Sequence, residues 1–293
     1  MIRAARPTFA EVPLADLSFN RDLAASSIEH ATLEPAATPP LPGSAAQAAV
    51  ASPIGGSLMR PYDPGSPLIF LHVPKTAGTS LREIFRGWFG PGLLEHYAGV
   101  HDGSLPVRHD LSTLISAGRP LAIYGHFNRR RGFGVDDYYP EVRQFVTVLR
   151  DPFERTVSGY RHLVRQHQAD PTRPAPSEGL RDYLRTKRDG AIGFFPGFIT
   201  ADNYEQMIDR YFVEIGVVER LEASLQRIAS ALGRSVDSAG LPRLNVNVEP
   251  VEEVGDLREE FIANHPLDYQ MYHYAWERSS TPEAPLRNGS ASS

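Results

Sequence analysis

The segment Pro74–Ser80, PKTAGTS, gathers residue types that bind anions. It lies between LIFLHV, an apolar run typical of a buried strand, and LREIFRGWF, whose apolar residues recur at helical spacing. Such a loop presents unpaired backbone N–H groups at the positive end of a helix dipole. Gly78 allows a close approach of the backbone to an anion, and Lys75 reaches over it. The predicted anion-binding residues are Lys75, Thr76, Ala77, Gly78, Thr79 and Ser80, the last two as hydroxyl donors.

This loop differs from the phosphate loop of nucleotide triphosphatases, G-x-x-x-x-G-K-[ST]. Its lysine precedes the glycine, and no acidic residue at a strand end is available as the usual magnesium ligand. The pattern therefore favours a phosphate ligand bound without a metal. The alternative is an ordinary turn between a strand and a helix that happens to contain lysine and glycine. Of the 30 basic residues only Lys75 and Lys187 are lysines, which hints that position 75 requires a compact ammonium group.

A second candidate anion site follows the apolar run QFVTVLR, which leads into DPFERTVSGYRHLVRQ. Arg150 ends the predicted strand, where a guanidinium can bind a phosphate with two hydrogen bonds. Asp151 can cap the following helix, with proline at its first position. Ser158 lies two turns along, off the apolar stripe, so its hydroxyl can face the same ligand. The alternatives are a structural ion pair for Arg150 and a surface position for Ser158.

His126 is the candidate general base. It follows the apolar run Leu121–Tyr124 and Gly125, at the carboxyl end of a predicted strand, where ligands of parallel sheets bind. The unperturbed pKa of histidine, about 6.5, suits a base at neutral pH. A satisfied structural histidine remains the alternative. His72 is expected to pack inside the first strand, and His96, His101 and His109 are expected in a loop.

Three consecutive arginines, Arg129, Arg130 and Arg131, follow the candidate base. They could bind an acidic acceptor such as a uronic-acid polysaccharide. A solvated loop explains them equally well, and both interpretations stay open. No spacing of histidines and carboxylates indicates a metal site.

Composition restricts the functional classes. The net charge of −5 argues against a nucleic-acid binder, although residues 120–190 hold 13 Lys and Arg against 9 Asp and Glu, as expected around an anionic ligand. The absence of cysteine excludes disulfides and thiolate chemistry. No apolar run approaches the roughly 18–20 residues of a membrane span. No apolar signal-peptide core is present, and we expect a cytoplasmic protein.

The elements that must position these residues alternate between strands and helices. This pattern predicts an α/β fold, a three-layer sandwich with a central parallel sheet and helices on both faces. Residues 1–65, rich in Ala, Pro and Ser, are predicted to be a disordered leader. The folded domain is expected to span residues 66–279, and residues 280–293 to form a disordered tail.

Two motifs resemble one known family. HVPKTAGTSL resembles the 5′-phosphosulfate loop of cytosolic and Golgi sulfotransferases, particularly the branch with heparan sulfate 2-O-sulfotransferase and bacterial relatives. VLRDPFERTVSGY is similar to that family's 3′-phosphate motif, an arginine at a strand end and a serine eight residues later, here Arg150 and Ser158. The resemblance extends over about residues 67–278. It includes the LNVNVEP loop. Arg243, just before this loop, and Asn245 and Asn247 within it could cover the donor nucleotide.

The resemblance implies a P-loop NTPase-like sulfotransferase fold. It also implies that 3′-phosphoadenosine 5′-phosphosulfate (PAPS) is the donor and that an acceptor hydroxyl, favoured to be on a saccharide, attacks its sulfur in line. Lys75 would stabilise the leaving phosphate. His126, in a Gly-His step like that of the resembled branch, would remove the acceptor proton. The alternatives are an ATP- or GTP-dependent phosphotransferase and a catalytically silent nucleotide- or carbohydrate-binding module.

Overall fold

A computed structural model of the 293-residue chain describes residues 59–99, 104–116, 118, 120–187, 190–236 and 254–280. The predicted disordered segments, apart from residues 59–65 and 280, lie outside these ranges, and so do His101 and the loop with Arg243, Asn245 and Asn247. Among the described residues, no helix is both long enough and apolar enough to cross a bilayer.

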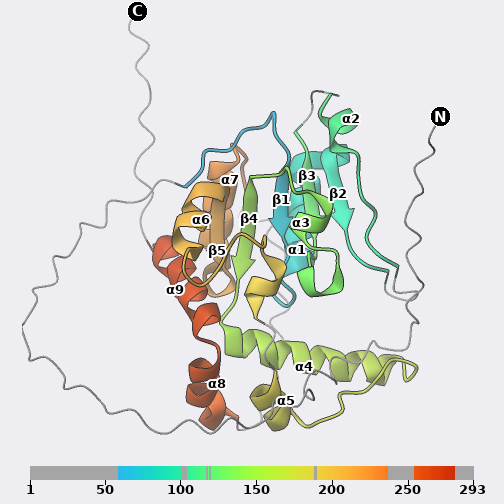
Figure 1. Cartoon of the computed structure of the whole chain (residues 1–293), viewed down its shortest axis with the longest axis vertical. Coiled ribbons are helices and arrows are strands. Elements are labelled where there is room, and N and C mark those ends of the chain that lie inside the picture. The colour runs from blue at the N-terminus through green and yellow to red at the C-terminus, as the bar shows by residue number, and fades with distance from the viewer. Residues whose placement is uncertain are drawn as a thin grey trace, which may run out of the picture. The chain divides into compact units, whose positions relative to one another are not determined.

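A parallel five-stranded sheet forms the centre of the domain (Figure 1). Its strand order is β2-β3-β1-β4-β5, which places β1 between β3 and β4. The carboxyl ends of these three strands are therefore neighbours at one edge of the sheet. The strands are β1 (Leu68–Leu71), β2 (Leu93–His96), β3 (Ala122–Gly125), β4 (Phe145–Leu149) and β5 (Phe212–Val217).

Helices cover both faces of this sheet. Along β1, Leu68 and Phe70 pack with α1 and α7, whereas Ile69 and Leu71 pack in a cluster with α6 and α9, because successive side chains of a strand point to opposite faces. The predicted α/β fold with a central parallel sheet is confirmed. The helices are α1 (Gly78–Phe89), α2 (Leu111–Ile115), α3 (Val135–Tyr138), α4 (Pro152–Ala169), α5 (Leu180–Thr186), α6 (Tyr204–Tyr211), α7 (Leu221–Ala231), α8 (Arg258–Asn264) and α9 (Pro266–Ser280).

Short 3-10 turns join several of these elements. Two of them, η2 and η3, contact each other near the carboxyl end of β3. The turns are η1 (Gly90–Gly92), η2 (Arg129–Arg131), η3 (Ala191–Phe194), η4 (Val218–Arg220) and η6 (Gly255–Leu257).

The edge strand β2 contains a histidine that was expected to lie in a loop. His96 was expected in a loop, but it ends β2 and is fully buried, with its ring stacked on Phe127 at 4.3 Å between centroids. A Cβ at Gly125 would overlap the carbonyl of His96, so glycine is what permits β2 and β3 to pair closely there. The strand has four residues and follows the turn GPG, which leaves too few positions for a periodic signal.

Helix α4 lies crosswise beyond the ends of the strands, with α5 and α8 beside it (Figure 1). Its apolar face, Phe153 and Val157, packs in one cluster with α5 and α8 rather than on the sheet. The predicted cap is confirmed, because the Asp151 carboxylate accepts a hydrogen bond from the N–H of Glu154 at 2.9 Å. The opposite face of α4 is polar, and this face carries Ser158.

Two residues before the predicted boundary at residue 66 are hydrogen-bonded to the domain. The N–H of Arg60 donates to the carbonyl of Phe212 at 3.0 Å, and the N–H of Asp63 donates to Gln144 Oε1 at 2.8 Å. Residues 59–65 are therefore attached to the domain, although their Pro- and Gly-containing sequence indicates no helix or strand.

Candidate active site

The loop between β1 and α1 has an unusual backbone. Lys75 and Ala77 both adopt left-handed conformations, with φ of 71° and 63°, and they are the only non-glycine residues with positive φ among those described. Each such position costs on the order of 1–2 kcal/mol for a residue with a Cβ. Residues in this conformation turn neighbouring N–H groups toward one side, which is how anion-binding loops are built. Ala77 also precedes the first turn of α1, whose N-terminus adds positive potential.

Two residues of this loop have roles that the sequence did not reveal. The Thr76 side chain is fully buried, and its hydroxyl donates to the carbonyl of Val73 at 2.8 Å, so it holds the loop closed. A Cβ at Gly78 would overlap the His72 ring, so Gly78 is needed for packing against this ring. Thr79 is exposed and Ser80 half-buried, which leaves their hydroxyls accessible.

Lys75 and Arg150 lie at the ends of adjacent strands and on the same side of the molecule. Arg150 Nη1 is 3.5 Å from the Lys75 carbonyl oxygen. Burial lowers the pKa of the Lys75 ammonium, and the charges of Arg165 and Arg150 lower it further. This gathering of basic side chains at two strand ends makes the cluster a candidate for anion binding.

The polar face of α4 supplies further groups to this cluster. Ser158, His162 and Arg165 follow one another at i, i+4 and i+7 and therefore share one helix face. Burial lowers the pKa of His162, and Lys75 and Arg165 add to this effect, which places both α4 residues near Lys75. His162 and Arg165 were not among the predicted site residues, although their spacing from Ser158 places them on the same face of a helix.

Arg155, on the same helix face but one turn earlier, belongs to a different environment. Its Nη2 lies 3.8 Å from Asp268 Oδ2, and its side chain is largely buried. The Asp268 carboxylate also accepts the N–H of Ala191 at 2.8 Å. Arg155 thus ties α4 to α9 and to the start of η3.

His126 has the geometry of a base. Its Nδ1 is 2.6 Å from the carbonyl oxygen of His72, and its backbone N–H donates to the carbonyl of His96 at 3.0 Å. Because a carbonyl oxygen only accepts, Nδ1 carries the proton and Nε2 keeps its lone pair. Burial lowers the pKa of His126, so the ring is neutral at pH 7. A neutral imidazole with a free Nε2 lone pair can accept a proton.

The three arginines after β3 form the exposed turn η2. Arg129 Nη2 approaches the carbonyl of Ile192 in η3 at 3.5 Å, and the Arg131 guanidinium lies 5.3 Å from the centroid of the Phe133 ring. The turn begins three residues after His126. The structure thus brings Lys75, Arg150 and His126 to the carboxyl ends of three neighbouring strands. Ser158 lies on α4, which runs beyond these ends (Figure 1).

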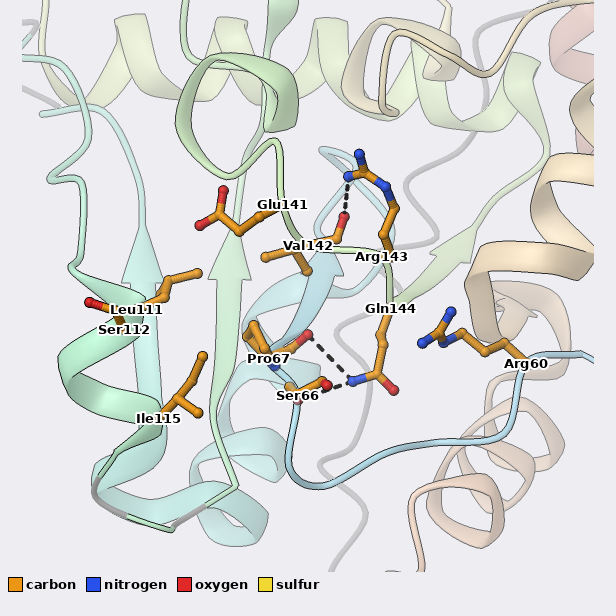
Figure 2. A pocket seen from close by; sticks show the side chains of 10 residues that line it. All are labelled: Arg60, Ser66, Pro67, Leu111, Ser112, Ile115, Glu141, Val142, Arg143 and Gln144. Atoms are coloured by element: carbon orange, nitrogen blue, oxygen red, sulfur yellow. Dashed lines mark hydrogen bonds between the residues drawn. The ribbon is translucent and has the colours of Figure 1, made fainter.

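A cavity of about 420 Å³ lies at the opposite edge of the sheet (Figure 2). It is lined by Pro67, which precedes β1, and by Gln144, which precedes β4, together with residues of α2. The Gln144 amide is already bonded to the carbonyl of Ser66 at 3.0 Å. This cavity is therefore separate from the cluster around Lys75. Among the described residues, no group of three or more His, Asp or Glu side chains is arranged to hold a metal ion.

Comparisons with known proteins identify the family of the chain. Residues 62–209 match the model of the sulfotransferase family. No curated protein matches the sequence significantly. Among 29 matching chains of solved structures is a crystal structure of mouse sulfotransferase SULT7A1 complexed with PAP, at 17% sequence identity and a TM-score of 0.38. This match covers 62% of the present chain and 63% of the mouse chain, less than two thirds of that protein's length. Because the family model covers half of the chain, the protein is a member of the sulfotransferase family, as its two motifs predicted.

Proposed function

We propose that the protein transfers the sulfuryl group of PAPS to a hydroxyl group of an acceptor. The proposal rests on the proximity of two basic residues that follow adjacent strands, Lys75 after β1 and Arg150 after β4. The neighbouring strand β3 is followed by His126, whose Nε2 lone pair is available to accept a proton. Membership of the sulfotransferase family supports the same reaction.

The residues present fit the two ends of the donor. The left-handed positions in the loop and the Lys75 ammonium suit the 5′-phosphosulfate. Arg150 and Ser158 are assigned to the 3′-phosphate, since a guanidinium can bind phosphate with two hydrogen bonds. Arg165 adds a further positive charge on this side of α4. Backbone N–H groups of Thr76, Ala77, Gly78, Thr79 and Ser80 complete the 5′ site.

Bound PAPS supplies an activated sulfuryl group that an oxygen nucleophile can take in line. His126 Nε2 accepts the proton of the acceptor hydroxyl, and the His72 carbonyl stabilises the resulting imidazolium at Nδ1–H. The Lys75 ammonium and the loop N–H groups stabilise the negative charge that develops on the departing phosphate. Fixing both partners at one sheet edge lowers the entropic part of the barrier.

We assign the acceptor to the acidic saccharides. Arg129, Arg130 and Arg131 form an exposed turn directly after the proposed base, where they can bind carboxylate or sulfate groups of a chain whose hydroxyl points at His126. Replacing Arg130 and Arg131 together by serine should raise KM for an acidic polysaccharide. It should leave unchanged the affinity for PAP, the 3′,5′-bisphosphate that remains when PAPS has given up its sulfuryl group. Equal KM values in wild type and variant would remove these arginines from acceptor recognition.

The reaction is tested with radiolabelled PAPS and a panel of saccharide and small-molecule acceptors, comparing wild type with Lys75→Ala and His126→Ala. Lys75→Ala should lose donor binding and turnover, whereas His126→Ala should lose turnover and keep donor affinity. Binding of PAP in EDTA separates this function from a metal-dependent phosphotransferase, which would bind ATP or GTP with magnesium instead. PAP binding without sulfate transfer to any acceptor would favour a silent binding module.

A further inference from the structure

The proposed base is one member of a cluster of three rings that we call the ring cluster: His72, Tyr97 and His126. The rings of His72 and His126 are stacked, with centroids 4.2 Å apart and an interplanar angle of 29°. The Tyr97 ring meets His126 edge-on at 4.9 Å. The Tyr97 hydroxyl is 2.9 Å from His72 Nδ1. His126 is therefore covered on one face by His72 and along another side by Tyr97.

The ring cluster is tied to the strands on both sides. The N–H of His72 donates to the carbonyl of Gly125 at 2.8 Å, and His126 Nδ1 donates to the carbonyl of His72. On its other side, the His72 ring occupies the space that a side chain at Gly78 would fill. A single imidazole thus contacts both the base and the first turn of α1, the two parts of the site that must hold their relative positions during transfer.

From these contacts we propose that His72 and Tyr97 are positioning residues for His126. The His72 ring keeps the His126 imidazole in place and excludes water from its face, and the Tyr97 hydroxyl fixes the His72 ring. This inference rests on the proposed role of His126 and deepens it. Neither residue needs to touch the donor or the acceptor.

Burial and nearby charges favour the neutral forms of His72 and His126 in the ring cluster. The charged and titratable groups that act on it are Lys75 in the loop, Arg82 and Arg86 on α1, and Glu95 and His96 on β2. Glu95 also pairs with Arg82 at 3.3 Å. Burial lowers the pKa of His72 well below its usual value, and the charges of His126, Arg82 and Lys75 act in the same direction. Two stacked, buried imidazoles repel each other when both are protonated, so His72 stays neutral when His126 takes up a proton.

The test uses the full-length protein with ¹⁵N-labelled histidine, because the long-range NMR spectrum reports the protonated nitrogen and the pKa of each ring without donor or acceptor. The variants are His72→Ala, His72→Phe and Tyr97→Phe, and His126→Gln assigns the His126 signal. In wild type we expect His126 with its proton on Nδ1 and a pKa below 6.5. His72→Ala should raise this pKa toward 6.5 by admitting water, His72→Phe should keep it low because the stack is retained, and Tyr97→Phe should raise it by a smaller amount.

Turnover provides the second readout. His72→Ala should lower kcat about 100-fold, the scale of a displaced catalytic group, with little change in KM for the donor, and His72→Phe should recover most of this loss. A wild-type His126 with its proton on Nε2, or an unchanged His126 pKa in His72→Ala, would overturn the inference. If no acceptor is ever sulfated, the proposed function fails, but the NMR result still decides whether His72 and Tyr97 position the ring.

Discussion

Arg150 Nη1 lies 3.5 Å from the carbonyl oxygen of Lys75, which joins the ends of two adjacent parallel strands. This proximity allows one nucleotide to contact Lys75 and Arg150 with its opposite ends. Had the two side chains opened onto different surfaces, one ligand could not have bridged them.

Removing the charge at either strand end should weaken binding of PAP. We expect Lys75→Ala and Arg150→Ala each to raise the Kd about 10- to 100-fold, because a hydrogen bond to a charged group contributes roughly 1.5–3 kcal/mol. Isothermal titration calorimetry measures this change. Arg181→Ala is the matched control, since Arg181 makes an exposed ion pair with Asp256 at 2.6 Å. A Kd for Arg150→Ala equal to that of the control would disprove the 3′-phosphate assignment.

Two glycines of α1 should respond in opposite ways to alanine. Gly78→Ala should lower the free energy of unfolding by about 1–3 kcal/mol, because its methyl group would displace the His72 ring. Gly87→Ala, on the exposed side of the same helix, meets no atom within 4 Å and should raise it by about 0.5–1 kcal/mol. Urea unfolding gives both values. If Gly78→Ala were as stable as wild type, the packing of His72 against the loop would be refuted.

Buried histidines should make the fold sensitive to acid. Burial lowers the pKa of His96 to about 4, from 6.5 in the unfolded chain. Between these values the unfolded chain binds a proton that the folded chain does not, so the free energy of unfolding falls as pH decreases from 6.5 to 4. For His96 alone the loss is about 3 kcal/mol. The lowered pKa values of His72 and His126 act in the same direction.

His96→Phe isolates the contribution of His96. The variant should show a smaller slope of unfolding free energy against pH below 6.5, with the ring stack on Phe127 retained. An unchanged slope would mean that His96 is already protonated in the folded protein.

The pKa of His126 is also lowered by burial. If His126 is the base, kcat should therefore decline only below pH 6.5, as a pH profile of turnover can measure.

The two lysines offer a test that needs no acceptor. Burial lowers the pKa of Lys187 to about 8, with further lowering by Arg155 and Arg130, and the pKa of Lys75 is also lowered. Both amines should therefore react with an acylating reagent at pH 8, as mass spectrometry of peptides can measure. PAP should protect Lys75 and leave Lys187 reactive, which makes Lys187 an internal control. Equal labelling of Lys75 with and without PAP would argue against its place in the donor site.

Much of this architecture could be predicted from local patterns. The strands β1, β4 and β5 are apolar runs flanked by helical periodicity, and Asp151 with Pro152 marks the start of α4. These signals come from residues near one another in the chain. Family membership, shown by the match over residues 62–209, was likewise predicted from two continuous motifs. The resemblance to one branch of the family stays a prediction.

The remaining features depend on contacts between distant segments. The stacking of His72 on His126 joins residues 54 apart in sequence, and no local pattern indicates it. His162 and Arg165 contribute to the site only because α4 turns its polar face away from α5 and α8. The short strand β2 is buried through its pairing with β3 rather than through its own periodicity.

The left-handed backbone at Lys75 and Ala77 has a consequence for engineering. Glycine would relax either position, so selection for heat resistance alone should enrich glycine at both sites. Lys75→Gly would then yield a more stable protein that lacks the ammonium group proposed to bind the donor. At this turn a higher melting temperature and the proposed role of Lys75 are opposed. A variant library selected for melting temperature alone should therefore lose sulfuryl transfer through substitution of Lys75.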